Sequence, residues 1–162
     1  QYNAADTAKA SKILNELGTP CLIHQPRYNM MDRWVEDGLL NTLEDSGIGA
    51  IAFSPLEQGI LTDKYLNGFP EDSRAIKDGR YLKSDAITPE ILDKVKALNA
   101  VAIERGQSLA QMAIAWLLKS PTITSVLVGV SKASQLYDNV KSLDHLEFSS
   151  EELKKIEAIL KD

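Results

Sequence analysis

Two apolar stretches of the chain are each followed by small polar residues and a lysine. Ile48–Phe53 leads into a loop that begins at Ser54 and contains Lys64. Thr122–Val128 leads into a turn that contains Lys132. Backbone N–H groups in loops of this kind, together with a lysine ammonium group, bind phosphates. Because parallel α/β proteins bind ligands at the carboxyl ends of their strands, the two stretches predict one shared anionic ligand.

The loop after Phe53 has the composition of a ligand-binding loop. Pro55 ends the strand, because proline has no N–H group to continue a β-ladder. Gly59 allows the backbone to approach a ligand closely, and Gly129 does the same after the later stretch. A plain surface loop is the alternative for the segment up to Lys64, and its residues favour neither interpretation.

Two further side chains lie where they could orient a ligand. Gln25 follows a short apolar stretch, and its amide can both donate to and accept from another amide. The alternative is that His24 and Gln25 close a turn and bond to the backbone. Phe53 ends its strand, so its ring could lie against a planar heterocycle, although a core aromatic is the more common role.

A third group of candidates lies near the start of a predicted helix. Ser131 begins this helix, where unpaired N–H groups and the helix dipole attract an anion, and Lys132 adds a positive charge. Gln135 and Asn139 are four residues apart on one helix face and could bind the edge of a base. A solvated helix face is the alternative for this pair.

Composition and charge exclude several classes of protein. Hydrophobic residues make up 44% of the 162 residues and charged residues 25%, which is typical of a globular protein. A net charge of −5 argues against nucleic acid as a partner, and no apolar run is long enough to span a membrane. The single cysteine, Cys21, fits a reducing, cytoplasmic compartment. No residues show metal-ligand spacing, so we expect no metal site.

The apolar periodicity predicts an α/β protein that forms a single domain over residues 1–162. Strands separated by helices and apolar throughout indicate a parallel sheet covered on its faces. Asp32 could cap the second helix, and Gly38 could split it. Residues 66–87 are expected to form a long surface loop. Helices are predicted at 4–17, 33–46, 89–104, 109–119, 131–143 and from 150 onward, and strands at 20–24, 48–53 and 123–128.

Three motifs in this order, with the predicted helices between them, resemble the aldo-keto reductases. They are Gln25-Pro-Arg-Tyr-Asn29, Phe53-Ser-Pro-Leu-Glu-Gln-Gly-Ile-Leu-Thr-Asp-Lys-Tyr65 and Gly129-Val-Ser-Lys-Ala-Ser-Gln-Leu-Tyr-Asp-Asn139. The likeness runs from Tyr2 to about Leu160 and points to the glyceraldehyde-3-phosphate-reducing branch and the related potassium-channel β subunits. It implies the C-terminal part of a (β/α)8 TIM barrel, with about three parallel strands and flanking helices.

The resemblance also implies a cofactor, NADPH, extended over the carboxyl face of the barrel. Gln25 would contact the carboxamide, and Phe53 would stack on the nicotinamide. Asp138 stands where the family more often has Glu. The remaining implied cofactor-binding residues are Ser54, Leu56, Gly59 and Lys64 at the pyrophosphate, Gly129 at a close backbone approach, Ser131 and Lys132 at the 2′-phosphate, and Gln135, Asp138 and Asn139 at the adenine end.

By this resemblance the protein is an NADPH-dependent reductase of aldehydes or ketones, and this chain supplies its cofactor-binding part. The family's catalytic Asp, Tyr, Lys and His lie in the first half of the barrel, and no position here matches them, so no catalytic residue is assigned. We therefore expect a partial barrel that needs its N-terminal half or another chain, and an oligomeric state. Two alternatives remain: a non-catalytic, redox-sensing regulatory subunit like the channel β subunits, and a half-barrel with only an assembly role.

Overall fold

The computed structural model describes residues 2–66 and 87–161. It divides into two compact units, residues 1–55 with 117–129 and residues 56–116 with 130–162, and each is described by itself. The surface loop predicted at 66–87 lies almost entirely outside the described residues. The expectation of a single domain stays a prediction.

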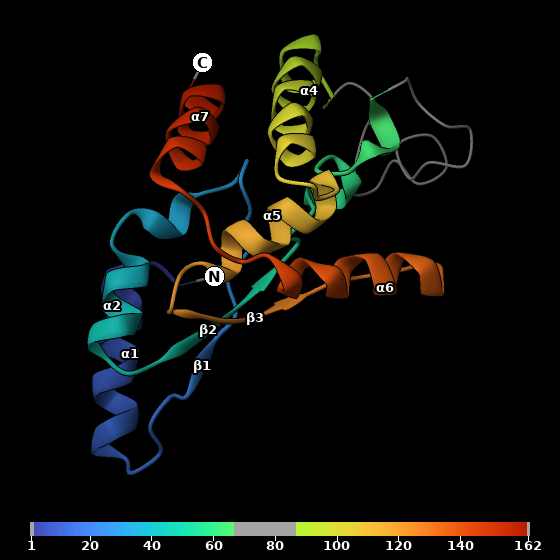
Figure 1. Ribbon diagram of the computed structural model, residues 1–162. Helices are drawn as coiled ribbons and strands as arrows, with labels where there is room; N and C mark the ends of the chain where they lie inside the picture. The colour runs from blue at the N-terminus through green and yellow to red at the C-terminus, as the bar shows by residue number, and fades with distance from the viewer. Residues whose placement is uncertain (1, 67–86, 162) are drawn as a thin grey trace. The chain divides into compact units, whose positions relative to one another are not determined.

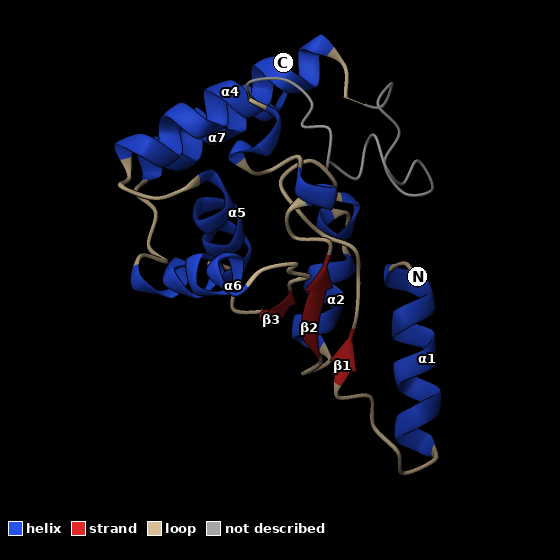
Figure 2. Ribbon diagram, turned by 90° about the vertical axis from the view of Figure 1, so that its right-hand side faces the viewer, coloured by secondary structure: helices blue, strands red, loops and turns tan. Residues whose placement is uncertain are grey.

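The first unit contains a three-stranded parallel sheet with the strand order β1-β2-β3. The strands are β1 (Ile23–His24), β2 (Gly49–Phe53) and β3 (Ile123–Leu127), and Figures 1 and 2 show them running in the same direction. In the central strand, Ala50 and Ala52 are fully buried. The predicted parallel sheet is therefore confirmed, although β1 is shorter than the stretch 20–24.

Two helices pack against each other in the first unit, α1 (Ala4–Glu16) and α2 (Leu39–Asp45), and α2 also contacts β2 (Figure 1). Leu39 and Leu43 of α2 are fully buried. The sequence did not reveal the N-cap of α1, Asn3, whose Oδ1 accepts the N–H of Asp6 at 2.9 Å.

The helix predicted over 33–46 is divided, as Gly38 suggested. A 3-10 turn, η1 (Trp34–Glu36), is followed by Gly38 at φ +80°, and α2 starts only at Leu39. An α-helix requires negative φ, so it cannot pass through this residue. The prediction that Asp32 caps the helix is wrong, because Asp32 instead pairs with Arg27 at 3.1 Å.

The second unit is mainly helical. Its core is formed by fully buried residues of three helices, among them Leu98, Met112 and Ile156, and α4 packs against α7. Its helices and turns are η2 (Glu57–Gly59), η3 (Asp63–Tyr65), α4 (Pro89–Glu104), α5 (Leu109–Leu118, whose last two residues belong to the first unit), α6 (Ala133–Val140), η5 (Lys141–Asp144) and α7 (Ser150–Lys161).

Three of the predicted helix starts are confirmed by their side-chain caps. Thr88 Oγ1 accepts the N–H of Ile91 at 3.3 Å. Ser108 Oγ accepts the N–H of Gln111 at 3.2 Å. Ser149 Oγ accepts the N–H of Glu152 at 3.2 Å. Each cap satisfies an N–H group that has no partner inside the helix. No helix within the described ranges is long and apolar enough to cross a membrane.

The helix predicted over 131–143 is shorter and starts later. Lys132 is its N-cap residue, α6 starts at Ala133, and residues from Lys141 continue as the 3-10 turn η5. Ser131 therefore precedes the N-cap residue, and its N–H donates to a side chain further along the helix, Gln135 Oε1, at 2.9 Å.

Candidate functional site

The first unit brings four of the predicted residues to one edge of its sheet. Gln25 directly follows β1, Phe53 ends β2 and Ser54 follows it, and Gly129 lies two residues after β3. Because the strands are parallel, these positions all lie at the carboxyl edge. Gln25 and Gly129 are exposed, whereas Phe53 and Ser54 are half-buried. A Cβ built at Gly129 would meet nothing within 4 Å, so a ligand could approach the backbone there.

The end of β2 is held by the segment that follows β1. The N–H of Phe53 donates to the carbonyl of Pro26 at 3.0 Å, and its own carbonyl accepts the N–H of Tyr28 at 3.3 Å. These bonds continue the parallel pairing past the last residue of β1. They fix the backbone from which the Phe53 ring projects.

Ser54 has an unusual backbone conformation that a buried asparagine stabilises. Its φ is +55°, a left-handed value that costs a non-glycine residue about 1–2 kcal/mol. The Nδ2 group of Asn29, which is fully buried, donates to the Ser54 carbonyl at 3.0 Å. Asn29 Oδ1 accepts the N–H groups of Met31 and Asp32 at 2.8 and 2.9 Å. Sequence analysis missed this role, although an Asn after a strand and a Pro is typical of an Asx turn.

Four charged side chains of the same unit, Arg27, Asp32, Arg33 and Glu36, form two ion pairs within the chain. Arg27 pairs with Asp32, and the Nε–Oδ2 distance is 3.1 Å. Burial raises the pKa of the Glu36 carboxyl, but hydrogen bonds from Arg33 (2.8 and 2.6 Å) and Tyr28 (2.7 Å) outweigh it and hold the pKa below its ordinary value. Burial lowers the pKa of His24, so this imidazole is neutral at pH 7.

In the second unit, the predicted pyrophosphate loop is shaped by its own hydrogen bonds. The carbonyl of Leu56 accepts the N–H groups of Gly59 (2.8 Å) and Leu61 (3.1 Å). Gly59 has φ +97°, which explains the glycine, and its carbonyl accepts the Thr62 hydroxyl at 2.7 Å. The exposed Lys64 has its Nζ 5.9 Å from the centre of the Tyr65 ring. A compact loop with one solvated ammonium group is compatible with anion binding.

The start of α6 exposes Ser131, Lys132 and Gln135. Gln135 Oε1 accepts both the N–H (2.9 Å) and the hydroxyl (3.1 Å) of Ser131. No side chain caps the first turn of α6, and this turn contains no acidic residue. The N-cap residue Lys132 therefore adds a positive charge to a helix start whose first turn contains no carboxylate.

The other two residues predicted on α6 are partly or fully buried. Asn139 is only 7% exposed, so the solvated-face alternative is wrong for it and holds for Gln135. Asp138 accepts hydrogen bonds from Ser108 Oγ at 2.9 Å and from Gln111 Nε2 at 2.6 Å. Both oxygens of its carboxylate are thus engaged with the start of α5.

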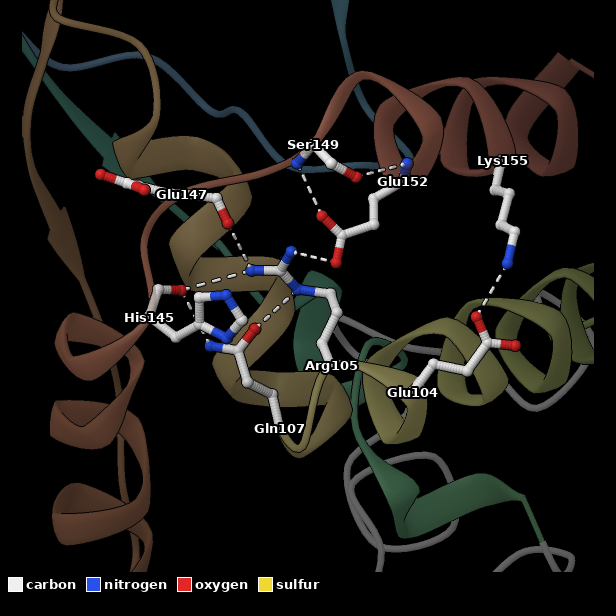
Figure 3. Close-up of polar contacts among 8 residues, drawn as sticks. All are labelled: Glu104, Arg105, Gln107, His145, Glu147, Ser149, Glu152 and Lys155. Atoms are coloured by element: carbon white, nitrogen blue, oxygen red, sulfur yellow. Dashed lines mark hydrogen bonds and ion pairs between the residues drawn. The ribbon is translucent and has the colours of Figure 1, made fainter.

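A second polar cluster in this unit, centred on Arg105, was not predicted (Figure 3). The Arg105 side chain is fully buried and pairs with Glu152 at 2.7 Å. Its guanidinium carbon lies 3.7 Å from the centre of the Phe148 ring. The cluster ties the segment before α7 to the end of α4 through further bonds from Arg105 to Gln107 Oε1 (2.9 Å), the His145 carbonyl (3.4 Å) and the Glu147 carbonyl (2.9 Å).

Comparison with known proteins identifies the family. The model of the Aldo/keto reductase family matches residues 2–161. The chain belongs to the aldo/keto reductase family. Members of this family fold as (β/α)8 barrels, and the three parallel strands with flanking helices form part of such a barrel. The predicted fold class is confirmed.

Individual curated proteins are similar to nearly the whole chain. L-glyceraldehyde 3-phosphate reductase from Escherichia coli O157:H7 is 50% identical over 99% of the chain and 48% of its own length. The protein of the same name from Escherichia coli K12 is 48% identical over the same shares. A probable voltage-gated potassium channel subunit beta from rice, Oryza sativa subsp. japonica, is 36% identical over 99% of the chain and 50% of its own length. The chain spans about half the length of these curated relatives.

Within the described residues, no group of three or more His, Cys, Asp or Glu side chains is arranged to hold a metal ion. Most of the predicted cofactor-binding residues of this aldo/keto reductase chain lie at the carboxyl edge of its sheet, in the loop from Leu56 to Lys64 and at the start of α6. All three carry exposed polar groups or backbone N–H groups. The assignment of each residue to a part of a cofactor stays a prediction.

Proposed function

We propose that the protein is an NADPH-dependent reductase of aldehydes or ketones and that this chain supplies its cofactor-binding part. Membership of the aldo/keto reductase family supports an oxidoreductase. The names of the two Escherichia coli relatives support a carbonyl substrate, and in those proteins it is L-glyceraldehyde 3-phosphate.

The observation that carries the choice of NADPH is the start of α6. Lys132 is exposed there beside a first turn without acidic residues. A helix N-terminus and an ammonium group together favour a phosphate, and NADPH differs from NADH by one phosphate on the adenosine ribose. In the proposal, Gln25 and Phe53 bind the nicotinamide end at the edge of the sheet. Reduction of a carbonyl also requires an acid that protonates the developing alkoxide, and we assign that group to residues outside this chain.

The test compares both cofactors with charge-reversed variants. Titration with NADPH and NADH is followed by the fluorescence of Trp34 and Trp116. Lys132→Glu is expected to weaken NADPH binding by about tenfold, because it replaces an attractive charge with a repulsive one, and to leave NADH binding nearly unchanged. The matched control is Lys141→Glu, which reverses the charge of an exposed lysine in η5. Equal losses for both cofactors would refute the assignment of Lys132.

A non-catalytic regulatory subunit that binds the nucleotide is the second candidate. The similarity to the rice channel subunit, 36% over 99% of the chain, is the observation in its favour. The two functions differ in turnover: a reductase oxidises NADPH when an aldehyde is added, whereas a sensor binds NADPH without consuming it. We expect the chain alone not to turn over. NADPH oxidation should appear when a polypeptide with the other part of the barrel is added, and its absence then would favour the sensor.

We further propose that the chain functions in the cytoplasm together with another polypeptide or a second copy. In the described part of the sheet, β1 and β3 each pair only with β2, so each leaves an edge with unpaired backbone groups. Closing a barrel removes such edges. Sedimentation velocity should therefore detect an oligomer, and a stable monomer at micromolar concentration would contradict this part of the proposal.

A further inference from the structure

The start of α5 carries a reciprocal capping box that leaves two donors unused. Ser108 Oγ accepts the N–H of Gln111 at 3.2 Å, and Gln111 Oε1 accepts the N–H of Ser108 at 3.1 Å. The hydroxyl hydrogen of Ser108 and the Nε2 group of Gln111 remain free to donate to other groups.

Both of these donors are directed at one carboxylate on a different helix. Ser108 Oγ donates to Asp138 Oδ2 at 2.9 Å, and Gln111 Nε2 donates to Asp138 Oδ1 at 2.6 Å. We call this pair of bonds the Asp138 link. It joins positions 30 and 27 residues apart in the sequence, and it places a negative charge at the positive end of the α5 dipole.

The Asp138 link fixes the rotation of α6 about its own axis. Asp138 lies one residue before Asn139, which is buried, and three residues after Gln135, which is exposed. A rotation that broke the link would also move these two side chains and Lys132 at the start of the helix, since all of them belong to the same two turns. Each Asp138 oxygen already accepts a strong, charge-assisted bond within the protein.

We propose that Asp138 is a positioning residue that holds α6 in the orientation required to bind the adenosine end of the cofactor, and that it does so through Ser108 and Gln111 without contacting the nucleotide. The inference rests on the proposed function, because it assumes that α6 binds this end of NADPH. It differs from the sequence-based expectation, in which Asp138 is itself a cofactor-binding residue.

The test uses adenosine 2′,5′-bisphosphate as the probe and reverses the direction of one bond. Gln111→Glu keeps the acceptor for the Ser108 N–H but replaces the Nε2 donor with a carboxylate that repels Asp138. Asp138→Asn as a single variant removes the negative charge of the Asp138 carboxylate. In the double variant, the introduced amide can donate to the introduced carboxylate, so the link is restored with donor and acceptor exchanged. Ser108→Ala removes the bond from Ser108 Oγ to Asp138 Oδ2. The matched control is Ser46→Ala, which changes an exposed serine in the first unit.

We expect Gln111→Glu to weaken binding of the bisphosphate about fivefold and Ser108→Ala about threefold, and we expect the double variant to return within about twofold of the unmodified chain. Calorimetric titration is performed at a temperature where circular dichroism shows every variant folded, so that loss of folding does not register as loss of affinity. If Gln111→Glu does not fold, Ser108→Ala, Asp138→Asn and their combination supply the same comparison. The losses of affinity in the two single variants should then not add in the combined variant.

Three results would overturn the inference. Equal affinity of Ser108→Ala, Gln111→Glu and the unmodified chain would mean that the Asp138 link does not affect binding. Asp138→Asn could instead lose affinity that the double variant does not recover, while Ser108→Ala keeps the affinity of the unmodified chain. That result would mean that Asp138 contacts the nucleotide itself. An unmodified chain that does not bind the bisphosphate would refute the proposed function as well, and this result is distinct from the other two.

Discussion

The starts of α6 and α7 look alike in sequence but differ in charge. Each has a serine whose N–H donates to a side chain of the first turns: Ser149 to Glu152 Oε2 at 2.6 Å, and Ser131 to Gln135 Oε1 at 2.9 Å. At α7 the acceptor is a carboxylate, and its other oxygen pairs with the buried Arg105. At α6 the acceptor is a neutral amide, and the N-cap residue is the positively charged Lys132.

This difference separates a helix start that stabilises the fold from one that we propose binds a ligand. The positive end of the α7 dipole is neutralised by its own Glu152, so an external anion would gain little there. The start of α6 lacks such a carboxylate and is exposed. Similar capping patterns in a sequence can therefore have different roles, and the charge of the capping side chain distinguishes them.

The largest effect is expected at the α7 start, from Arg105→Ala. The free energy of unfolding should fall by about 3–5 kcal/mol, because the substitution removes a fully buried side chain, leaves Glu152 without its ion-pair partner and leaves the Glu147 carbonyl without its donor. Urea denaturation followed by circular dichroism measures this loss. A loss below about 1 kcal/mol would show that the cluster does not stabilise the fold, and the comparison would fail.

Removing the two serines should sharpen the comparison. Ser149→Ala should cost about 1 kcal/mol, because Ser149 Oγ caps the N–H of Glu152. Ser131→Ala should cost only a few tenths of that amount, because Ser131 precedes the N-cap residue and no side chain caps the first turn of α6. Urea midpoints of the two variants at the same pH give the answer. Equal losses would mean that both serines are structural caps.

The pH dependence of stability should change with Glu152. Burial raises the pKa of this carboxyl, but the hydrogen bonds from Ser149 and the Arg105 charge outweigh it, so the pKa in the folded state lies below the ordinary value of 4.5. Its contribution to stability is therefore complete above the unfolded-state pKa and is lost as the pH falls through the lower, folded-state pKa. Glu152→Gln should flatten the decline in thermal midpoint below about pH 5. An unchanged pH profile would contradict the role assigned to this carboxylate.

The smallest effect is expected from Lys155→Met. Lys155 Nζ lies 2.8 Å from Glu104 Oε2, which resembles the Arg105–Glu152 pair in distance. Both side chains are more than half exposed, so solvent screens their attraction. The urea midpoint should not change measurably. A clear loss would indicate that exposure does not explain the contrast between the two ion pairs.

Local sequence signals predicted much of the fold, because they depend on residues close together in the chain. The N-caps Thr88, Ser108 and Ser149 each bond to an N–H three residues later. The strand that ends at Phe53 was recognised from its apolar run and from Pro55. The same approach placed four candidate residues at the carboxyl edge of a parallel sheet, where the structure has them.

Long-range contacts account for most of what the sequence could not predict. The partners of Arg105 lie up to 47 residues away at Glu152, and Asn29 reaches Ser54 across 25 residues. No spacing rule connects such positions. The late start of α6 was missed for another reason: serine is a common N-cap residue, but here the Ser131 hydroxyl donates to Gln135 Oε1 and Lys132 is the N-cap residue.

The open outer edge of β3 has a consequence for the colloidal stability of the chain. β3 has only one hydrogen-bonded neighbour among the described residues, and Thr124, Ser125 and Leu127 on it are exposed. In neutral buffer the net charge of −5 on each chain opposes association beyond the proposed oligomer. That repulsion disappears near the isoelectric point of about 5.1. Light scattering should therefore rise as the buffer is acidified towards this pH, well before acid unfolds the protein, with the open edge of β3 as the first point of contact between molecules.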